Sequence, residues 1–254
     1  MHLRFWFKTA LHRFTPGGFG YMRTLRRWRD PRFDLARDAH PVRRKHHGRG
    51  GWRRDRQGPL RYRDYQDYQE YVDHQRQKLD EILKIRGGFS NREVTAYRLK
   101  FYRRFRHLRG LLPAGARILC CGARQGTEVE VLRDLGYPHA YGIDLNPGPD
   151  NPFVRPGDFM HLDEADRSLD LIYSNCLDHA FDLEAMLDEH LRVLKPGGYV
   201  LYDVNCAEEA IGGAFEAVSW DSAEDLLLFL LRRFPRLLRA QREEAWIWFL
   251  LQRP

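Results

Sequence analysis

The stretch RILCCGARQG, residues 117–126, decides the fold of this chain. Its four apolar residues, 118–121, form a continuous run, which is typical of a parallel strand covered on both faces. Gly122 and Gly126 then bracket a short loop, and residues 127–132 have the spacing of a helix. A strand, a glycine turn and a helix N-terminus bring backbone N–H groups close to a ligand. The stretch therefore predicts a binding turn at the end of a buried strand.

A second short strand, residues 140–144, ends in a carboxylate, Asp144. An acid at the tip of the second strand is where nucleotide-binding α/β proteins hold ribose hydroxyls. Further strands are expected over 168–175 and 199–204, and the helix between them, over about 182–194, meets a Lys-Pro-Gly-Gly stop signal. The series predicts a doubly wound parallel sheet with a ligand crevice at its carboxyl edge.

Four stretches resemble the class I S-adenosylmethionine-dependent methyltransferases, more narrowly the methyltransferase type 11 kind. They are the glycine loop 118–126, Gly142-Ile143-Asp144, Gly157-Asp158-Phe159, and LRVLKPGG at 191–198. The resemblance covers roughly residues 110–254. It implies an α/β fold with a seven-stranded, mostly parallel sheet and an antiparallel last strand. A helix over about 221–233, with Asp221 or Ser222 as its N-cap, and a hairpin of 237–242 with 245–251 would complete this fold.

The resemblance also implies S-adenosyl-L-methionine as cofactor and a role for each matching residue. Asp144 would hold the ribose hydroxyls, Asp158 the adenine amino group, and Phe159 would flank the adenine ring. The methionine end would lie over the loop, and the other residues expected at the cofactor are Cys121, Gly122, Ala123, Arg124, Gly126, Glu128, Leu145 and Asn175.

His179, in the segment Leu177-Asp178-His179, is the best available general base and is the candidate catalytic residue. The alternative is a structural histidine that faces the cofactor loop. No Asn-Pro-Pro-Tyr-type sequence occurs at Asn175, so an amino-group acceptor on a nucleobase or glutamine gets no support.

The glycine loop departs from the resembled family at two positions. Cys120 stands where the family usually has an acid, and Arg124 stands where it has a further glycine. The guanidinium of Arg124 either contacts the carboxylate of the cofactor, which suits a fork-shaped donor, or points into water. Glu128 either replaces the missing acid as partner of the cofactor's amino group or complements the helix dipole.

Charge divides the chain into a basic part and an acidic part. Residues 1–110 hold 29 Lys and Arg against 11 Asp and Glu, and the remaining residues hold 13 against 24. We expect a basic, partly disordered extension over 1–60, a helical cap or lead-in over 61–110, and the cofactor-binding domain over 111–254. Two helices are expected in the lead-in, over 62–86 and about 92–108, where they could cover the cofactor and substrate cleft.

Residues 1–29 are rich in aromatic side chains and contain seven Lys and Arg but no acid. Such a segment could lie on an anionic membrane surface, contact nucleic acid, serve as a transit peptide, or pack on the globular domain. The four cysteines include no CxxC pair, which argues against a disulfide framework or a zinc site. The longest aliphatic and aromatic run, 226–231, is too short to cross a bilayer. We expect a cytoplasmic protein without a metal, with peripheral membrane contact left open.

The reaction that the resemblance implies is in-line methyl transfer from a sulfonium to an acceptor, which depends chiefly on alignment. A small molecule, a glycan and a lipid-linked intermediate are all open as acceptors. Two other classes also remain open. One is a nucleic-acid-binding or RNA-modifying protein that uses the basic extension, and the other is a non-catalytic scaffold with the cofactor fold. The sequence does not predict the oligomeric state.

Overall fold

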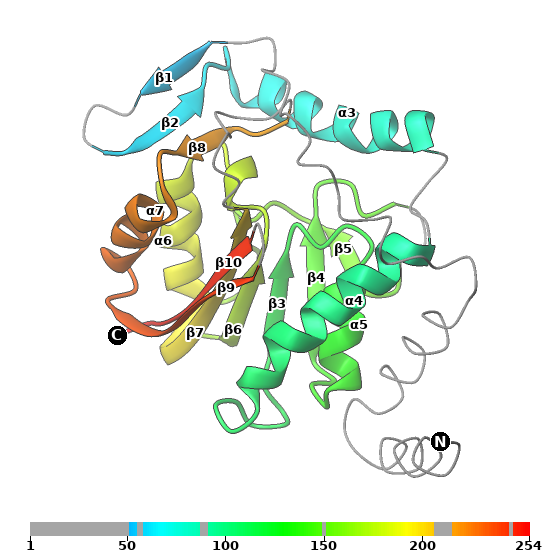
Figure 1. The fold of residues 1–254 in the computed structure, drawn as a ribbon, viewed down its shortest axis with the longest axis vertical. Helices are drawn as coiled ribbons and strands as arrows, with labels where there is room; N and C mark the ends of the chain where they lie inside the picture. Colours follow the sequence, from blue (N-terminus) through cyan, green and yellow to red (C-terminus); the bar gives the residue numbers. More distant parts are fainter. Residues whose placement is uncertain (1–50, 55–57, 87–90, 149–150, 206–214, 244–245) are drawn as a thin grey trace.

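The computed structural model describes residues 51–254 except for the segments 55–57, 87–90, 149–150, 206–214 and 244–245 (Figure 1). The expected basic extension therefore lies almost entirely outside the described residues, and so does its predicted contact with a membrane or nucleic acid through residues 1–29. No helix in the described part of the chain is long and apolar enough to cross a membrane.

The main sheet has seven strands in the order β5-β4-β3-β6-β7-β10-β9. Neighbouring strands from β5 to β7 are parallel, whereas β10 runs antiparallel to both β7 and β9. The predicted sheet, mostly parallel with an antiparallel last strand, is thus confirmed. The strands are β3 (Ile118–Cys121), β4 (Ala140–Asp144), β5 (Val154–Pro156), β6 (Leu169–Ser174), β7 (Leu194–Asn205), β9 (Arg236–Glu243) and β10 (Trp246–Gln252).

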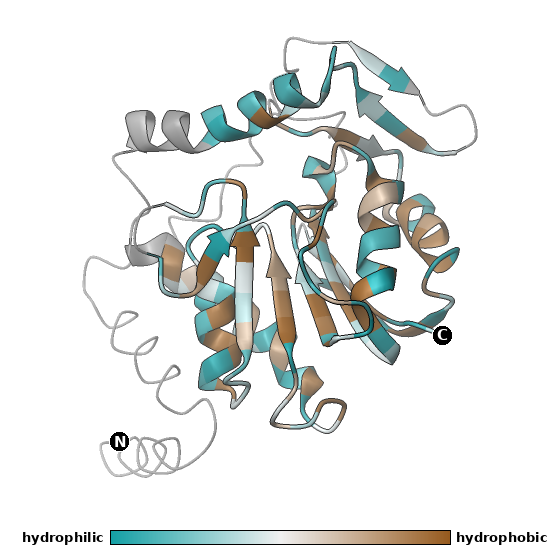
Figure 2. Cartoon of the chain, turned by 180° about the vertical axis from the view of Figure 1, so that it is seen from behind, coloured by the Kyte–Doolittle hydropathy of each residue, from teal (hydrophilic) through white to brown (hydrophobic). Residues whose placement is uncertain are grey.

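Helices cover both faces of this sheet, and β3 contributes alternate residues to each face. Ile118 and Cys120 pack in one core cluster with side chains of α4 (Asn91–Phe105) and α5 (Thr127–Asp134). Leu119 and Cys121 pack in the other with side chains of α6 (Leu183–Val193) and α7 (Ala223–Leu231). Figure 2 shows the mostly apolar strands between these helices. The apolar run in the sequence is therefore a central strand.

The N-caps of α6 and α7 follow from short polar side chains just before each helix. Asp182 accepts a hydrogen bond from the backbone N–H of Ala185 at 3.0 Å, and Ser222 accepts one from the backbone N–H of Asp225 at 3.0 Å. Of the two N-caps expected for α7, the structure uses Ser222. At its other end α6 stops at Val193, and β7 begins at Leu194, earlier than expected, with a register shift before Tyr199.

A second, smaller sheet lies at the carboxyl edge of the main sheet, together with α3 (Tyr68–Arg86) (Figure 1). It consists of β1 (Trp52–Arg54), β2 (Leu60–Arg63) and β8 (Val218–Trp220), in that order and all antiparallel. The boundary expected between residues 60 and 61 falls within β2 and stays a prediction.

The helix expected over 62–86 is wrong in its first turn. Tyr62 lies in β2, where it pairs with Val218, and the N–H of Arg63 donates to the carbonyl of Ala217 at 2.8 Å. The backbone N–H and C=O groups of β2 therefore form their hydrogen bonds with the β8 segment and not within a helix, and α3 begins only at Tyr68. The next helix, α4, ends at Phe105 and continues as the 3-10 turn η1 (Arg106–Leu108), close to the expected range.

A buried ionic cluster fixes α4 to the sheet. Asp203 of β7 is fully buried and lies 2.9 Å from Lys100 Nζ and 3.2 Å from Arg104 Nε. Arg104 also pairs with Glu243 of β9 at 2.5 Å. The ammonium of Lys100 stands 3.3 Å from the ring centre of Trp246, a cation–π contact. Both cations therefore depend on Asp203 for their closest buried countercharge.

Asp203→Asn should destabilise the protein by about 3 kcal/mol, because it leaves buried cations without that countercharge. Asp188→Asn is the matched control, since Asp188 pairs with Arg233 at 3.0 Å but is largely exposed. It should cost less than about 1 kcal/mol. The free energy of unfolding in urea measures both. Equal costs for the two variants would show that the buried cluster contributes no more than a surface pair.

Candidate active site

The loop from β3 to α5 contains three residues in the left-handed region. Gly122, Arg124 and Gly126 have φ of 68°, 40° and 75°. The loop is closed by the N–H of Gly126, which donates to the carbonyl of Ala123 at 2.7 Å. Glycine adopts this conformation freely, whereas a residue with a side chain pays about 1–2 kcal/mol. The departure from the family's glycine at position 124 therefore places a side chain where the backbone is strained.

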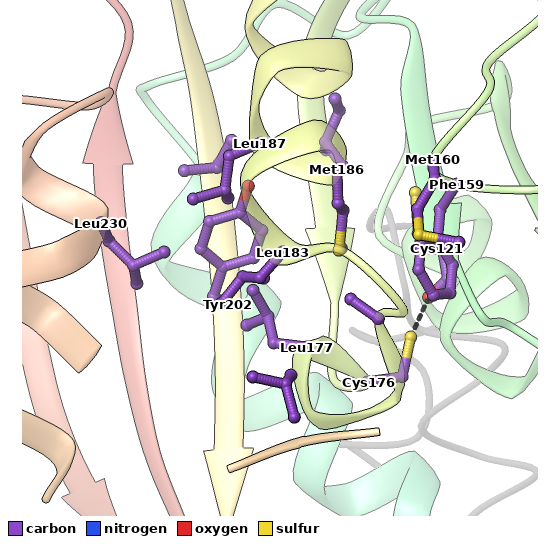
Figure 3. Packing of buried hydrophobic residues seen from close by; sticks show 14 of the residues in the cluster. Cys121, Phe159, Met160, Cys176, Leu177, Leu183, Met186, Leu187, Tyr202 and Leu230 are labelled. Atoms are coloured by element: carbon purple, nitrogen blue, oxygen red, sulfur yellow. Dashed lines mark hydrogen bonds between the residues drawn. The ribbon is translucent and has the colours of Figure 1, made fainter. Parts of the chain in front are cut away.

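Gly122 permits a close approach between two strand ends. A Cβ at this position would lie 2.3 Å from Cys176 Sγ, in the segment that follows β6. The thiol of Cys176 donates to the backbone carbonyl of Cys121 at 3.4 Å, as Figure 3 shows. The side chain of Cys121 itself points away from the loop, with its sulfur 3.6 Å from His190 Nε2 in the core. Only the backbone of Cys121 thus belongs to the site.

Asp144, at the tip of β4, ties this loop to the neighbouring strand. Its half-buried carboxylate accepts the N–H of Arg124 on Oδ2 at 3.0 Å and the N–H of Asn146 on Oδ1 at 2.8 Å. A carboxylate has about four acceptor positions, so two backbone donors leave room for hydroxyl donors. Leu145 is half-buried and packs against one of the two core clusters.

Asp158 and Phe159 follow β5, on the same edge of the sheet. The carboxylate of Asp158 accepts the N–H of Met160 at 2.8 Å and the hydroxyl of Tyr68. Phe159 is buried, and Figure 3 shows it beside Met160 and Cys121. Asp158 and Phe159 were predicted at the site, whereas Tyr68 was not, and its one signal in the sequence is the three-residue spacing from Tyr71 in α3.

Glu128 lies in the first turn of α5 and is buried. Burial and, to a lesser extent, the charge of Asp144 raise the pKa of its carboxyl to about 8, against a hydrogen bond from its own backbone and the cations Lys100 and Arg124. Glu128 is therefore mostly protonated at neutral pH, and it can donate a hydrogen bond as a neutral acid. The helix dipole, which favours a carboxylate here, does not outweigh the cost of burial.

His179 ends the 3-10 turn η2 (Leu177–His179) and is held from three sides. Its Nδ1 lies 2.9 Å from the carbonyl of Phe215, its Nε2 lies 2.6 Å from Lys78 Nζ, and its own carbonyl accepts the hydroxyl of Tyr71 at 2.9 Å. Burial and the charge of Lys78 hold the pKa of the imidazole well below its usual range. Neither Lys78 nor Phe215 was predicted, since no local pattern marks them.

The structure thus gathers most of the predicted residues at one edge of the sheet. The loop 122–126, Asp144 and Asp158 lie at the ends of three neighbouring strands, β3, β4 and β5. Asn175 directly follows β6 and is half-buried. The described residues contain no group of three or more side chains suited to hold a metal ion.

Gly122→Ala should cost about 1–3 kcal/mol of stability, because the new methyl group meets Cys176 Sγ. Cys176→Ala in the same chain removes that sulfur and should recover part of the loss. Gly110→Ala is the matched control, since Gly110 has φ of 84° but no atom within 4 Å of the added Cβ. It should show the backbone cost alone. Thermal or urea unfolding measures all three, and no recovery in the double variant would reject the contact as the cause.

The comparisons with known proteins agree with this geometry. The family model described as a methyltransferase domain matches residues 119–202. A 1,6-didemethyltoxoflavin-N1-methyltransferase structure from Burkholderia thailandensis, with bound 1,6-didemethyltoxoflavin and S-adenosylhomocysteine, is 17% identical with a TM-score of 0.59, over 80% of this chain and 98% of that one. A possible histamine N-methyltransferase from Thermotoga maritima is 17% identical with a TM-score of 0.50, over 72% of this chain and 99% of that one.

A S-adenosylmethionine-dependent methyltransferase from Aquifex aeolicus is 16% identical with a TM-score of 0.50, over 66% of this chain and 100% of that chain. No curated protein matches the sequence. At these identities the solved structures establish the fold, and the family match lies on the strands and the loop that carry the site. Residues 119–202 therefore match a methyltransferase domain, and the chain has the fold of the S-adenosylmethionine-dependent methyltransferases to which it is similar.

Proposed function

We propose that this protein transfers a methyl group from S-adenosyl-L-methionine to an acceptor at the carboxyl edge of the sheet, below α3. The observation that carries the proposal is the position of Asp144. Its half-buried carboxylate stands at the tip of β4 and binds the backbone of the glycine loop. A carboxylate beside such a loop suits a ribose, and the methyltransferase domain indicates the cofactor to which that ribose belongs.

The remaining residues of the site fit the other parts of this cofactor. The loop 122–126 offers backbone to the methionine end, and Asp158 with Phe159 would meet the adenine ring. Tyr68 already bonds Asp158, so it would either stay beside the adenine or exchange that bond for the adenine amino group. When bound, the cofactor supplies a methyl group on a positively charged sulfur. Cys121, Ala123, Leu145 and Asn175 would line the site around these groups.

Alignment is the main task of such a site, since a sulfonium gives up its methyl group to a well-placed nucleophile. The rigid strand ends hold Asp144 and the loop, and α3 places tyrosine hydroxyls over the same edge. The acceptor stays within the classes that the sequence left open, a small molecule, a glycan or a lipid-linked intermediate.

Asp144→Ala should weaken binding of S-adenosylmethionine by about ten- to a hundredfold, because charge-assisted hydrogen bonds contribute about 1.5–3 kcal/mol. Isothermal titration calorimetry measures the affinity, and circular dichroism checks the fold. Asp163→Ala, which removes an exposed carboxylate outside the site, is the control and should bind normally. If Asp144→Ala also bound normally, Asp144 would not be part of the site. A wild-type protein that does not bind the cofactor would favour the scaffold alternative.

Arg124→Ala should weaken S-adenosylmethionine and S-adenosylhomocysteine alike, by about 1–3 kcal/mol, if the guanidinium meets the carboxylate that both ligands carry. Adenosine lacks this carboxylate, so its affinity should hardly change and serves as the internal control. Arg124→Gly relieves the strained backbone but lacks the side chain, so it should not restore affinity. Equal affinities in the wild type and both variants would place the guanidinium outside the cofactor site.

A further inference from the structure

Lys78 and His179 form a side-chain pair that the cofactor does not require. Lys78 Nζ, from α3, lies 2.6 Å from His179 Nε2, from the turn after β6. The direction of this hydrogen bond follows from the other side of the imidazole ring. The carbonyl of Phe215, 2.9 Å from Nδ1, can only accept, so Nδ1 carries the proton. Nε2 then has a lone pair, and Lys78 is the donor to it.

The position of Phe215 makes this tautomer secure. Its carbonyl also accepts the side-chain amide of Gln75 at 2.8 Å, one helical turn before Lys78 in α3. The same helix fixes the backbone of His179 through the hydroxyl of Tyr71. The imidazole is therefore oriented by groups on two sides, and it in turn fixes where the Lys78 amine stands.

The titratable groups around Lys78 come from three segments of the chain. Arg124 belongs to the glycine loop, Cys176 and Asp178 to the segment after β6, and Glu216 to the residues before β8. Burial and, after it, the charge of Arg124 lower the pKa of the Lys78 amine to about 8, against the opposing effect of Asp178, Cys176 and Glu216. A substantial fraction of Lys78 is thus a neutral amine at slightly alkaline pH. Through His179 the pair stands in the turn that follows β6.

We propose that Lys78, oriented by His179, accepts a proton from the methyl acceptor, so that the acceptor is a phenol, a thiol or an ammonium group. This inference rests on the proposed function and names the chemical class of its acceptor. A thioether or a neutral tertiary amine has no proton on the atom that takes the methyl group, so its methylation would not need Lys78 and His179. In this reading His179 is a positioning residue, and the proton acceptor is the amine that it holds.

The proposed step conserves charge at the site. The acceptor's X–H bond breaks, its proton moves to the Lys78 amine, and the electron pair left on X forms the bond to the methyl carbon, while the former sulfur–carbon pair stays on sulfur. The positive charge lost from the sulfonium reappears on Lys78. An N–H of the amine donates to His179 Nε2 throughout, so the lone pair on Nζ is turned toward a different partner.

Competitive labelling with trace acetic anhydride from pH 6 to 11 tests the amine without cofactor or acceptor. Peptide mass spectrometry of the full chain follows Lys78, with added Nα-acetyl-lysine as the standard. Lys78 should become reactive with a midpoint near pH 8. A midpoint equal to that of the standard would overturn the proposal. Cofactor titration is measured separately, so a protein that fails to bind the cofactor contradicts the proposed function and leaves the labelling result valid.

The second test separates a proton acceptor from a fixed cation that binds an anionic acceptor. Lys78→Arg keeps the charge but cannot lose its proton at these pH values. With phenol, 2-mercaptoethanol and benzylamine as probes, which still carry their protons at pH 8, formation of S-adenosylhomocysteine by the wild type should rise with pH around a midpoint of about 8. Lys78→Arg should bind the cofactor normally and turn over about a hundredfold more slowly. Undiminished turnover in Lys78→Arg, or methylation of a thioether probe alone, would overturn the proposal.

His179→Ala checks the positioning role. If His179 only orients the amine, this variant should lose turnover while the rise of rate with pH persists, because Lys78 is still the titrating group. Loss of the rise in His179→Ala, with the rise retained in Lys78→Arg, would instead make His179 the base, and would overturn the assignment to Lys78.

Discussion

Ile118–Cys121 has no exposed side chain on either face of the sheet, and the positions of the functional groups follow from that burial. A strand buried on both faces must lie inside the sheet and needs a layer of helices on each side. Because β3 pairs in parallel with β4 on one side and β6 on the other, three carboxyl ends meet at one edge. The glycine loop, Asp144 and Cys176 are therefore neighbours through the topology of the sheet, although they are far apart in the sequence.

The α3 helix completes this edge with one face of its surface. Tyr68, Tyr71, Gln75 and Lys78 recur at three- and four-residue steps, so they lie along one side of the helix. Each reaches a different group at the strand ends: Asp158, the carbonyl of His179, the carbonyl of Phe215 and the imidazole of His179. These polar contacts, together with apolar packing, fix both the rotation of α3 about its axis and its position along that axis. Displacement of α3 would therefore disturb two places at once: Asp158, where the adenine is expected, and His179, where the methyl acceptor is expected.

Local signals explain what the sequence could predict, and distant pairings explain what it could not. The buried strand, the glycine turn and the carboxylate at the tip of β4 each depend on residues within a few positions of one another. In contrast, the sequence predicts a helix where the last two residues of β2 lie, because the partner strand, β8, is more than 150 residues later in the chain. Lys78 was not named because its partner His179 is 101 residues away. For Glu128 the sequence indicated a helix start, but it did not show the burial that keeps its carboxyl protonated.

Arg124 affects both the backbone conformation of the glycine loop and the protonation of Lys78 and Glu128. A glycine there would present only backbone and would relieve a left-handed conformation that costs about 1–2 kcal/mol. Arg124 instead adds a permanent cation beside Lys78, and that cation is the second cause, after burial, of the lowered pKa of the Lys78 amine. It acts in the opposite sense on Glu128, where it favours the charged carboxylate. Arg124 thus shifts the protonation of two side chains on different helices, Lys78 and Glu128. Because a guanidinium keeps its proton, Lys78 is the one of the two neighbouring cations that becomes neutral first.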